Sequence, residues 1–209
     1  MMPSSKEVLE KLNKCTGERA FAGYLKQQPL LVFWTFFSVG GHMHYVIPEF
    51  GLGKGFRCDF VLMQSYSGGW HVSFVELEPV VDSVFNKDGT PSKRLRGAQT
   101  QIMKWQNYVH HDEASLRSQL ADAGRKDDIF DPSNRNYEPS SYSATDLRDP
   151  KSYVEWDYYI VIGRRDNLKE DKRIWKNALS HQSSYAIVSY DRFVDTAKGT
   201  EDYRSRQKS

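Results

Sequence analysis

Gly55-Phe-Arg-Cys-Asp59-Phe-Val-Leu-Met63 is the stretch from which the fold is best predicted. A second stretch, Trp70-His-Val-Ser-Phe-Val-Glu76-Leu-Glu78, follows it after six residues. Both pieces are rich in β-branched and aromatic residues, and Gly-Gly at 68–69 marks a turn between them. The sequence therefore predicts a β-hairpin with strands at about 56–64 and 70–78. Asp59 stands on the first strand, and Glu76 and Glu78 stand on the second. Burying an unpaired carboxylate costs several kcal/mol, so these acids need a physical explanation.

A divalent cation would supply that explanation. If the turn is centred near 67–68, Asp59 falls opposite Glu76, and Glu76 and Glu78 point to one face roughly 6–7 Å apart. Oxygen ligands without Cys or His favour Mg²⁺ or Mn²⁺ over Zn²⁺. Alternatively, Glu76 and Glu78 face solvent on an edge strand and bind nothing. The apolar residues around the two acids favour the metal interpretation.

The rest of the chain alternates between helical and strand patterns. Helices are expected at about 6–15, 16–28, 93–110 and 168–180, with a short last helix from Asp191. Further strands are expected at 44–50, 157–163 and 185–189. This order predicts an α/β (α+β) protein with a mixed central sheet flanked by helices.

Three local expectations concern the helices. Thr16 is expected to cap the second helix and Pro29 to end it, so that 31–37 becomes an extended segment or a loop. Ile174, Trp175 and Leu179 are expected to point inward from the helix at 168–180.

The domain boundaries are expected from composition. One domain is expected over 1–196, followed by a flexible tail at 197–209. Within it, 121–156 is polar and aperiodic, which is typical of an insertion or a substrate loop.

The composition is that of an ordinary globular protein. Of 209 residues, 39% are hydrophobic and 27% are charged, and the net charge is only +2. Nucleic-acid binding would therefore require a local basic patch. Two cysteines do not make a disulfide framework. No signal-peptide pattern is visible and the longest apolar stretch, 30–37, is too short to span a bilayer, so a cytoplasmic protein without membrane association is expected.

The helix at 93–110 adds a second candidate for the site. Gln101 falls in its apolar stripe, where a buried amide needs a partner such as a strand carboxylate or a metal-bound water. The alternative is that Gln101 lies at the edge of the stripe with its amide in water.

Basic residues gather at the same helix and are candidates for phosphate contacts. They are Lys93, Arg94, Arg96 and Lys104. The later cluster at 172–176 is interpreted as a solvated charged face, because Glu170 and Asp171 adjoin it. His42 and His44 have the i, i+2 spacing of a metal pair, but no third ligand follows at suitable spacing and no histidine is given a catalytic role.

In their order along the chain, several motifs resemble the Shedu-type nuclease domain of bacterial anti-phage defence, within the PD-(D/E)XK nuclease superfamily. The resemblance covers roughly 17–195. The matching stretches include Tyr24-Leu-Lys-Gln-Gln-Pro29, Ile47-Pro-Glu-Phe-Gly-Leu-Gly53, Cys58-Asp59-Phe-Val-Leu62, Phe74-Val-Glu-Leu-Glu-Pro79, Gly97-Ala-Gln-Thr-Gln-Ile-Met-Lys-Trp105 and Val161-Ile-Gly-Arg-Arg165.

The resemblance implies a restriction-endonuclease-like core and a role for each site residue. Asp59 and Glu76 would be the metal ligands, Gln101 would support the site, and Glu18 would match an accessory acid. Glu78 occupies the position of the superfamily's usual Lys. It would act as a base or a further metal ligand, or else Lys93, Arg94 or Arg96 would supply the missing positive charge.

The implied activity is Mg²⁺- or Mn²⁺-dependent hydrolysis of DNA phosphodiester bonds. The expected partners are DNA and further copies of the chain, as a dimer or tetramer. One alternative is a catalytically weak or inactive binding module on the same fold, for nucleic acid or protein. Another is a hydrolase of RNA or nucleotides that uses the same acids.

Overall fold

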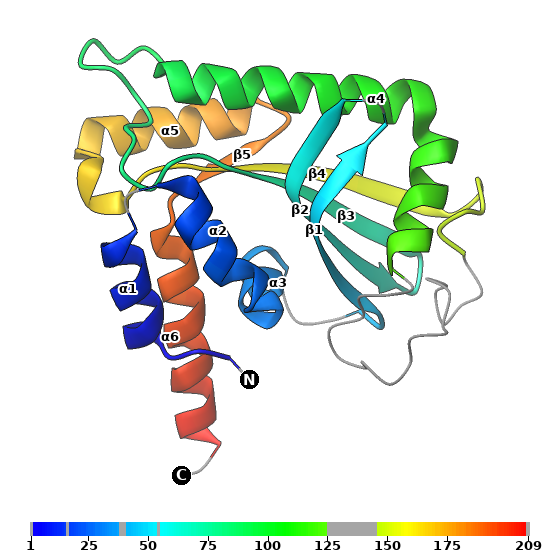
Figure 1. Cartoon of the computed structure of the whole chain (residues 1–209), viewed down its shortest axis with the longest axis horizontal. Coiled ribbons are helices and arrows are strands. Elements are labelled where there is room, and N and C mark those ends of the chain that lie inside the picture. The colour runs from blue at the N-terminus through cyan, green and yellow to red at the C-terminus, as the bar shows by residue number, and fades with distance from the viewer. Residues whose placement is uncertain (1, 16, 38–40, 54, 125–145, 208–209) are drawn as a thin grey trace. The chain divides into compact units, whose positions relative to one another are not determined.

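The computed structural model describes residues 2–15, 17–37, 41–53, 55–124 and 146–207. The strands of its mixed sheet follow the order β1-β2-β3-β4-β5 (Figure 1). They are β1 (His44–Leu52), β2 (Phe56–Tyr66), β3 (Gly69–Leu77), β4 (Tyr153–Val161) and β5 (Ala186–Val188). β2 pairs antiparallel with both β1 and β3, whereas β4 and β5 are parallel. The predicted mixed sheet with flanking helices is confirmed and is consistent with a PD-(D/E)XK-like core.

The chain divides into two compact units. One contains 1–37, 77–99 and 159–209, and the other contains 38–76 and 100–158. The expectation of a single domain over 1–196 stays a prediction.

The first unit gathers most of the helices. α1 (Ser5–Lys14), α2 (Glu18–Lys26), α3 (Pro29–Phe36) and α6 (Asp191–Arg206) pack on one another (Figure 1). The hydroxyl of Ser4 accepts a hydrogen bond from the Glu7 N–H at 3.1 Å and so caps α1. α5 (Glu170–Gln182) follows a short 3₁₀ turn, η1 (Arg165–Asn167), and packs beside β5.

The second unit is built on the predicted hairpin. Tyr66 pairs with Gly69, so the turn is centred at 67–68 as the sequence predicts. α4 (Lys93–Gly124) contributes its residues from Thr100 onward to this unit. The buried rings of Phe74 on β3 and Trp105 on α4 lie 6.1 Å apart, which places α4 over the face of β3 that carries Phe74.

One prediction near the N-terminus is wrong. The segment 31–37 is not extended, because Pro29 begins α3 rather than only ending α2. Proline suits the first helical turn, where its missing N–H is not needed. α3 is apolar nearly all round and therefore lacks the one-sided stripe that reveals a surface helix. The N-cap of α2 is Gly17 without a side-chain cap, and the Thr16 cap lies outside the described residues.

The helix predicted at 93–110 continues to Gly124. It contains a kink at Asp112, where φ is −127° and ψ is 29°. Within the polar segment predicted at 121–156, β4 already begins at Tyr153, and 125–145 lies outside the described residues.

The last two helices also differ from their predictions. Ile174 and Trp175 of α5 are 63% and 42% exposed, and none of the described residues of this helix is fully buried. α6 runs to Arg206, so most of the predicted flexible tail is helical. No helix among the described residues is both long and apolar enough to cross a membrane.

Candidate metal centre

Asp59 and Glu76 lie at one register level on neighbouring strands. Phe60 pairs with Val75 in the antiparallel ladder, and the two acids are the next residues on each strand. Both are half-buried. Burial, and then the charges of Glu76 and Asp59, raise the pKa of the adjacent Cys58 thiol. The charges of both carboxylates are therefore close enough to act on the same residue, Cys58 on β2.

Helix α4 covers the face of the hairpin on which these acids lie. Glu76 is two residues from Phe74 and so shares its face, against which Trp105 packs. Gln101, one turn before Trp105, donates its side-chain N–H to the Arg57 carbonyl at 3.0 Å. One partner of the amide is thus main chain, two residues before Asp59, while a carboxylate or a metal-bound water as a further partner stays a prediction.

The same helix brings a buried polar atom to this face. The indole nitrogen of Trp105, a residue that is 0% exposed, has no hydrogen-bond partner among the described residues. Buried donors of this kind are rare in folded proteins.

Glu49 on β1 is a candidate that sequence reasoning missed. It lies between the register pairs Pro48–Phe60 and Phe50–Cys58, which places it at the level of Asp59. Its φ is +52°, the left-handed conformation that a side chain disfavours by roughly 1–2 kcal/mol. Strain of this kind concentrates at functional sites. The resemblance motif around residues 47–53 was the one available signal.

Glu78 follows directly after β3 and belongs to the first unit. Glu78 is 8% exposed. The main chain is held on both sides, because its N–H donates to the Val161 carbonyl at 2.8 Å and its carbonyl accepts from the Tyr190 hydroxyl at 2.6 Å. That Glu78 shares a face with Glu76 stays a prediction. Glu18 is the first residue of α2, and its side chain lies outside the described part of the structure.

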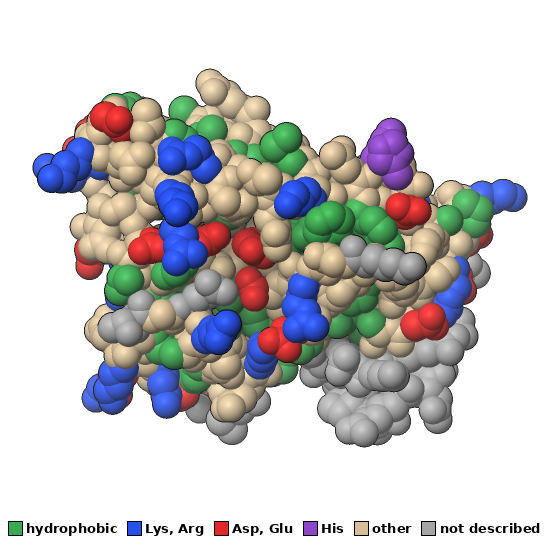
Figure 2. All heavy atoms as spheres, turned by 45° about the horizontal axis from the view of Figure 1, so that its top comes forward, with side chains coloured by type: hydrophobic (Ala, Val, Ile, Leu, Met, Phe, Trp, Pro, Cys, Tyr) green, Lys and Arg blue, Asp and Glu red, His purple; other side chains and the backbone are tan. Residues whose placement is uncertain are grey.

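The predicted phosphate-contact residues differ in their surroundings. Arg94 pairs with Asp82 at 3.2 Å, and Arg96 donates to the Pro91 carbonyl. Lys104 lies over the Phe56 ring, 5.9 Å from its centroid, and Lys93 is exposed. On the face shown in Figure 2, basic side chains are interspersed with acids, so any positive patch is local, as the net charge of +2 indicates.

A second group of possible metal ligands lies elsewhere on β3 and β4. His71, Glu155 and Asp157 offer ligand atoms within 4.8 Å of one another, and His71 Nδ1 is 3.0 Å from Glu155. His71 is five residues from Glu76, roughly 16 Å along the strand at about 3.3 Å per residue and on the opposite face. No role for His71 could be predicted from local sequence, because its partners lie more than 80 positions away along the chain.

The donor set at Asp59 and Glu76 fits a hard cation better than a transition metal. Both candidate ligands are carboxylates, which suit Mg²⁺ or Mn²⁺. Their partial burial and shared register level bring two like charges together, and a divalent ion would offset their repulsion.

The fold and this site define a class: an α/β protein with paired acids on adjacent strands of a mixed sheet, beneath a helix that carries a Gln. Within that class, the chain belongs to the family described as Shedu protein SduA, C-terminal, whose model matches residues 16–194. The Shedu-type resemblance is thereby confirmed, while the superfamily assignment stays a prediction. No curated protein is similar enough to this chain to count as a match.

Proposed function

We propose that this chain is a metal-dependent DNA endonuclease that acts in anti-phage defence. The observation that carries the proposal is the shared register level of Asp59 and Glu76, in a chain that belongs to the Shedu family. The defence context and DNA as the substrate come from the family resemblance. The two acids would hold Mg²⁺ or Mn²⁺.

The bound ion would supply a water of lowered pKa and stabilise the charge that develops on the phosphate. The protein's own residues would hold the reacting groups in position. Gln101 ties α4 to the Arg57 carbonyl and so fixes the first strand of the hairpin beside Asp59. Glu78 would act as a base or a further ligand, and its main chain is anchored within the first unit by Val161 and Tyr190.

The test is cleavage of supercoiled plasmid with Mg²⁺ or Mn²⁺, comparing the wild type with Asp59→Asn/Glu76→Gln. These changes keep the side-chain shapes and remove both negative charges. The matched control is Glu10→Gln/Asp202→Asn, which makes the same chemical change at two exposed positions. We expect the site variant to lose cleavage by about 100-fold or more and the control to cleave as the wild type does. Equal cleavage by the wild type and the site variant, or no cleavage with either metal, overturns the proposal.

One observation favours a second candidate, a binding module with weak or no catalysis. Glu78 stands where the superfamily usually has Lys, and a carboxylate cannot offset phosphate charge. DNA or protein binding without Mn²⁺ binding or cleavage would support this candidate. A panel of RNA and nucleotide substrates separates the third possibility, a hydrolase of those molecules, from DNA cleavage.

A further inference from the structure

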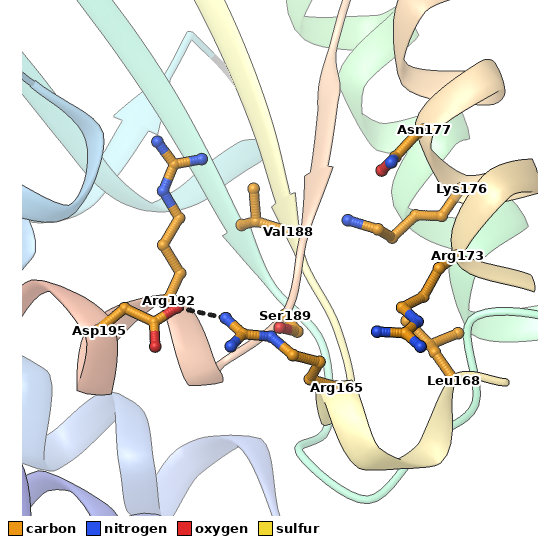
Figure 3. A pocket seen from close by; sticks show the side chains of 9 residues that line it. All are labelled: Arg165, Leu168, Arg173, Lys176, Asn177, Val188, Ser189, Arg192 and Asp195. Carbon is orange, nitrogen blue, oxygen red and sulfur yellow. Dashed lines mark hydrogen bonds and ion pairs between the residues drawn. The ribbon is translucent and has the colours of Figure 1, made fainter. Parts of the chain in front are cut away.

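A basic cavity of about 420 Å³ lies within the first unit (Figure 3). Its walls come from η1, α5, the end of β5 and α6. The residues used below are Arg165, Arg173, Lys176, Ser189, Arg192 and Asp195. The volume lies in the range of small-molecule sites. It exceeds what a single phosphate group needs.

Positive charge dominates this cavity. Of the described residues that line it, four are cationic and one, Asp195, is acidic. Asp195 is already paired with Arg165. The sequence placed Arg173 and Lys176 on a solvated face, but the structure adds Arg165 and Arg192 from other elements around the same space.

One of the cations, Arg192, is held in place by contacts outside the cavity. Arg192 donates to the Thr35 carbonyl at 2.9 Å, and its guanidinium lies 6.0 Å from the centroid of the Phe36 ring. The guanidinium of Arg165 is held by Asp195, which also lines the cavity. A fixed guanidinium loses little entropy when it binds an anion.

Lys176 has the spare donors that an anion would need. Within the described part of the chain, its ammonium group donates one hydrogen bond, to the Ile187 carbonyl at 3.1 Å, and a lysine has three N–H donors. Figure 3 shows this side chain reaching from α5 across the cavity toward Val188. Burial, and then the charges of Arg165 and Arg192, lower the pKa of Lys176, so positive charge here is in excess.

We propose that this cavity binds a phosphate monoester of about mononucleotide size, with the phosphate group on Lys176 and Arg173. Three positive charges remain after the Arg165–Asp195 pair, and a dianionic phosphate would offset two of them. Phosphate suits both guanidinium and ammonium donors. The Ser189 hydroxyl adds a neutral donor to the lining. The proposal uses none of the acids of the proposed nuclease and does not depend on them.

The experiment is isothermal titration calorimetry in low-salt, phosphate-free buffer, with AMP, inorganic phosphate and adenosine as separate titrants. AMP and inorganic phosphate should bind the wild type and adenosine should not, because the phosphate carries recognition. Lys176→Met and Arg173→Gln should each weaken AMP binding by about tenfold or more. Lys169→Met removes one charge just before α5 without touching the cavity, and it should bind AMP as the wild type does.

Three results would overturn the proposal. One is the absence of AMP and phosphate binding to the wild type, and another is unchanged binding in Arg173→Gln, whose exposed position leaves folding intact. The third is a Lys176-dependent affinity for a short DNA duplex without any for AMP, which would make the cavity part of a nucleic-acid surface. If Lys176→Met fails to fold, Lys176→Arg replaces it and should retain AMP binding.

Discussion

Asp59 lies level with Glu76, one register step beyond the Phe60–Val75 pair of the hairpin. On its other side Asp59 lies level with Glu49 of β1. Acids therefore occupy one register level on three consecutive strands. Like charges at this spacing raise the free energy of the folded protein unless a cation or a hydrogen-bond donor compensates.

The backbone of Glu49 gives a prediction about stability. With φ at +52°, Glu49→Gly should be more stable than Glu49→Ala by about 1 kcal/mol, because glycine is not strained there. In an ordinary strand the order is reversed. Urea unfolding of the two variants measures the difference. If the alanine variant is equally or more stable, Glu49 is not strained.

Glu78 gives a prediction about catalysis. If its carboxylate acts as a base or ligand, Glu78→Gln should lower plasmid cleavage by about tenfold or more. Glu78→Lys introduces the usual superfamily residue and should cleave better than Glu78→Gln. Initial rates at a fixed Mg²⁺ concentration provide the comparison. Wild-type rates in both variants would show that Glu78 has no part in the chemistry.

The hydrogen bond from Tyr190 to the main chain of Glu78 gives a prediction about stability. Its hydroxyl donates to the Glu78 carbonyl at 2.6 Å, and the residue is 0% exposed. Tyr190→Phe leaves a carbonyl without that donor and should lower the free energy of unfolding by about 1–3 kcal/mol. Tyr203 is 64% exposed, so Tyr203→Phe is the matched control and should change little. A Tyr190→Phe variant as stable as the control would mean that water replaces the lost donor.

The contact of α1 with α6 should make stability depend on pH. The Ser5 hydroxyl and N–H donate to Glu201 at 2.7 and 2.9 Å, and these bonds lower the pKa of that carboxyl. A carboxyl with a lowered folded-state pKa stabilises the protein above its unfolded pKa, and this is lost as the pH falls through the folded value.

At pH 7 the wild type should therefore have a higher melting temperature than Glu201→Gln. This difference in melting temperature should disappear below about pH 4.3. Thermal melts at several pH values test this, with Glu10→Gln as the exposed control. A difference that stays constant with pH would contradict the assigned cause.

Much of the hairpin could be predicted from local sequence. The Gly-Gly turn and the strand composition determine the register, and with it the shared level of Asp59 and Glu76 just beyond the Phe60–Val75 pair. α3 could not be predicted in the same way, since an evenly apolar octapeptide has no helical stripe.

The other features that could not be predicted depend on the folded chain, which local sequence patterns do not encode. The positive φ of Glu49 is invisible in residue types. The basic cavity joins Arg165, Lys176 and Arg192 from three separate elements, so only the folded chain brings their charges together. Ile174 is exposed although its apolar character favoured an inward position.

The central claim is that Asp59 and Glu76 share one metal ion, and calorimetric titration with Mn²⁺ tests it most directly. The wild type should bind Mn²⁺, and Asp59→Asn or Glu76→Gln should weaken binding by about tenfold or more. His71→Ala, which disrupts the other possible ligand group on β3, should bind Mn²⁺ as the wild type does. Binding that survives in Asp59→Asn and is lost in His71→Ala would contradict the account and move the metal to the His71 group.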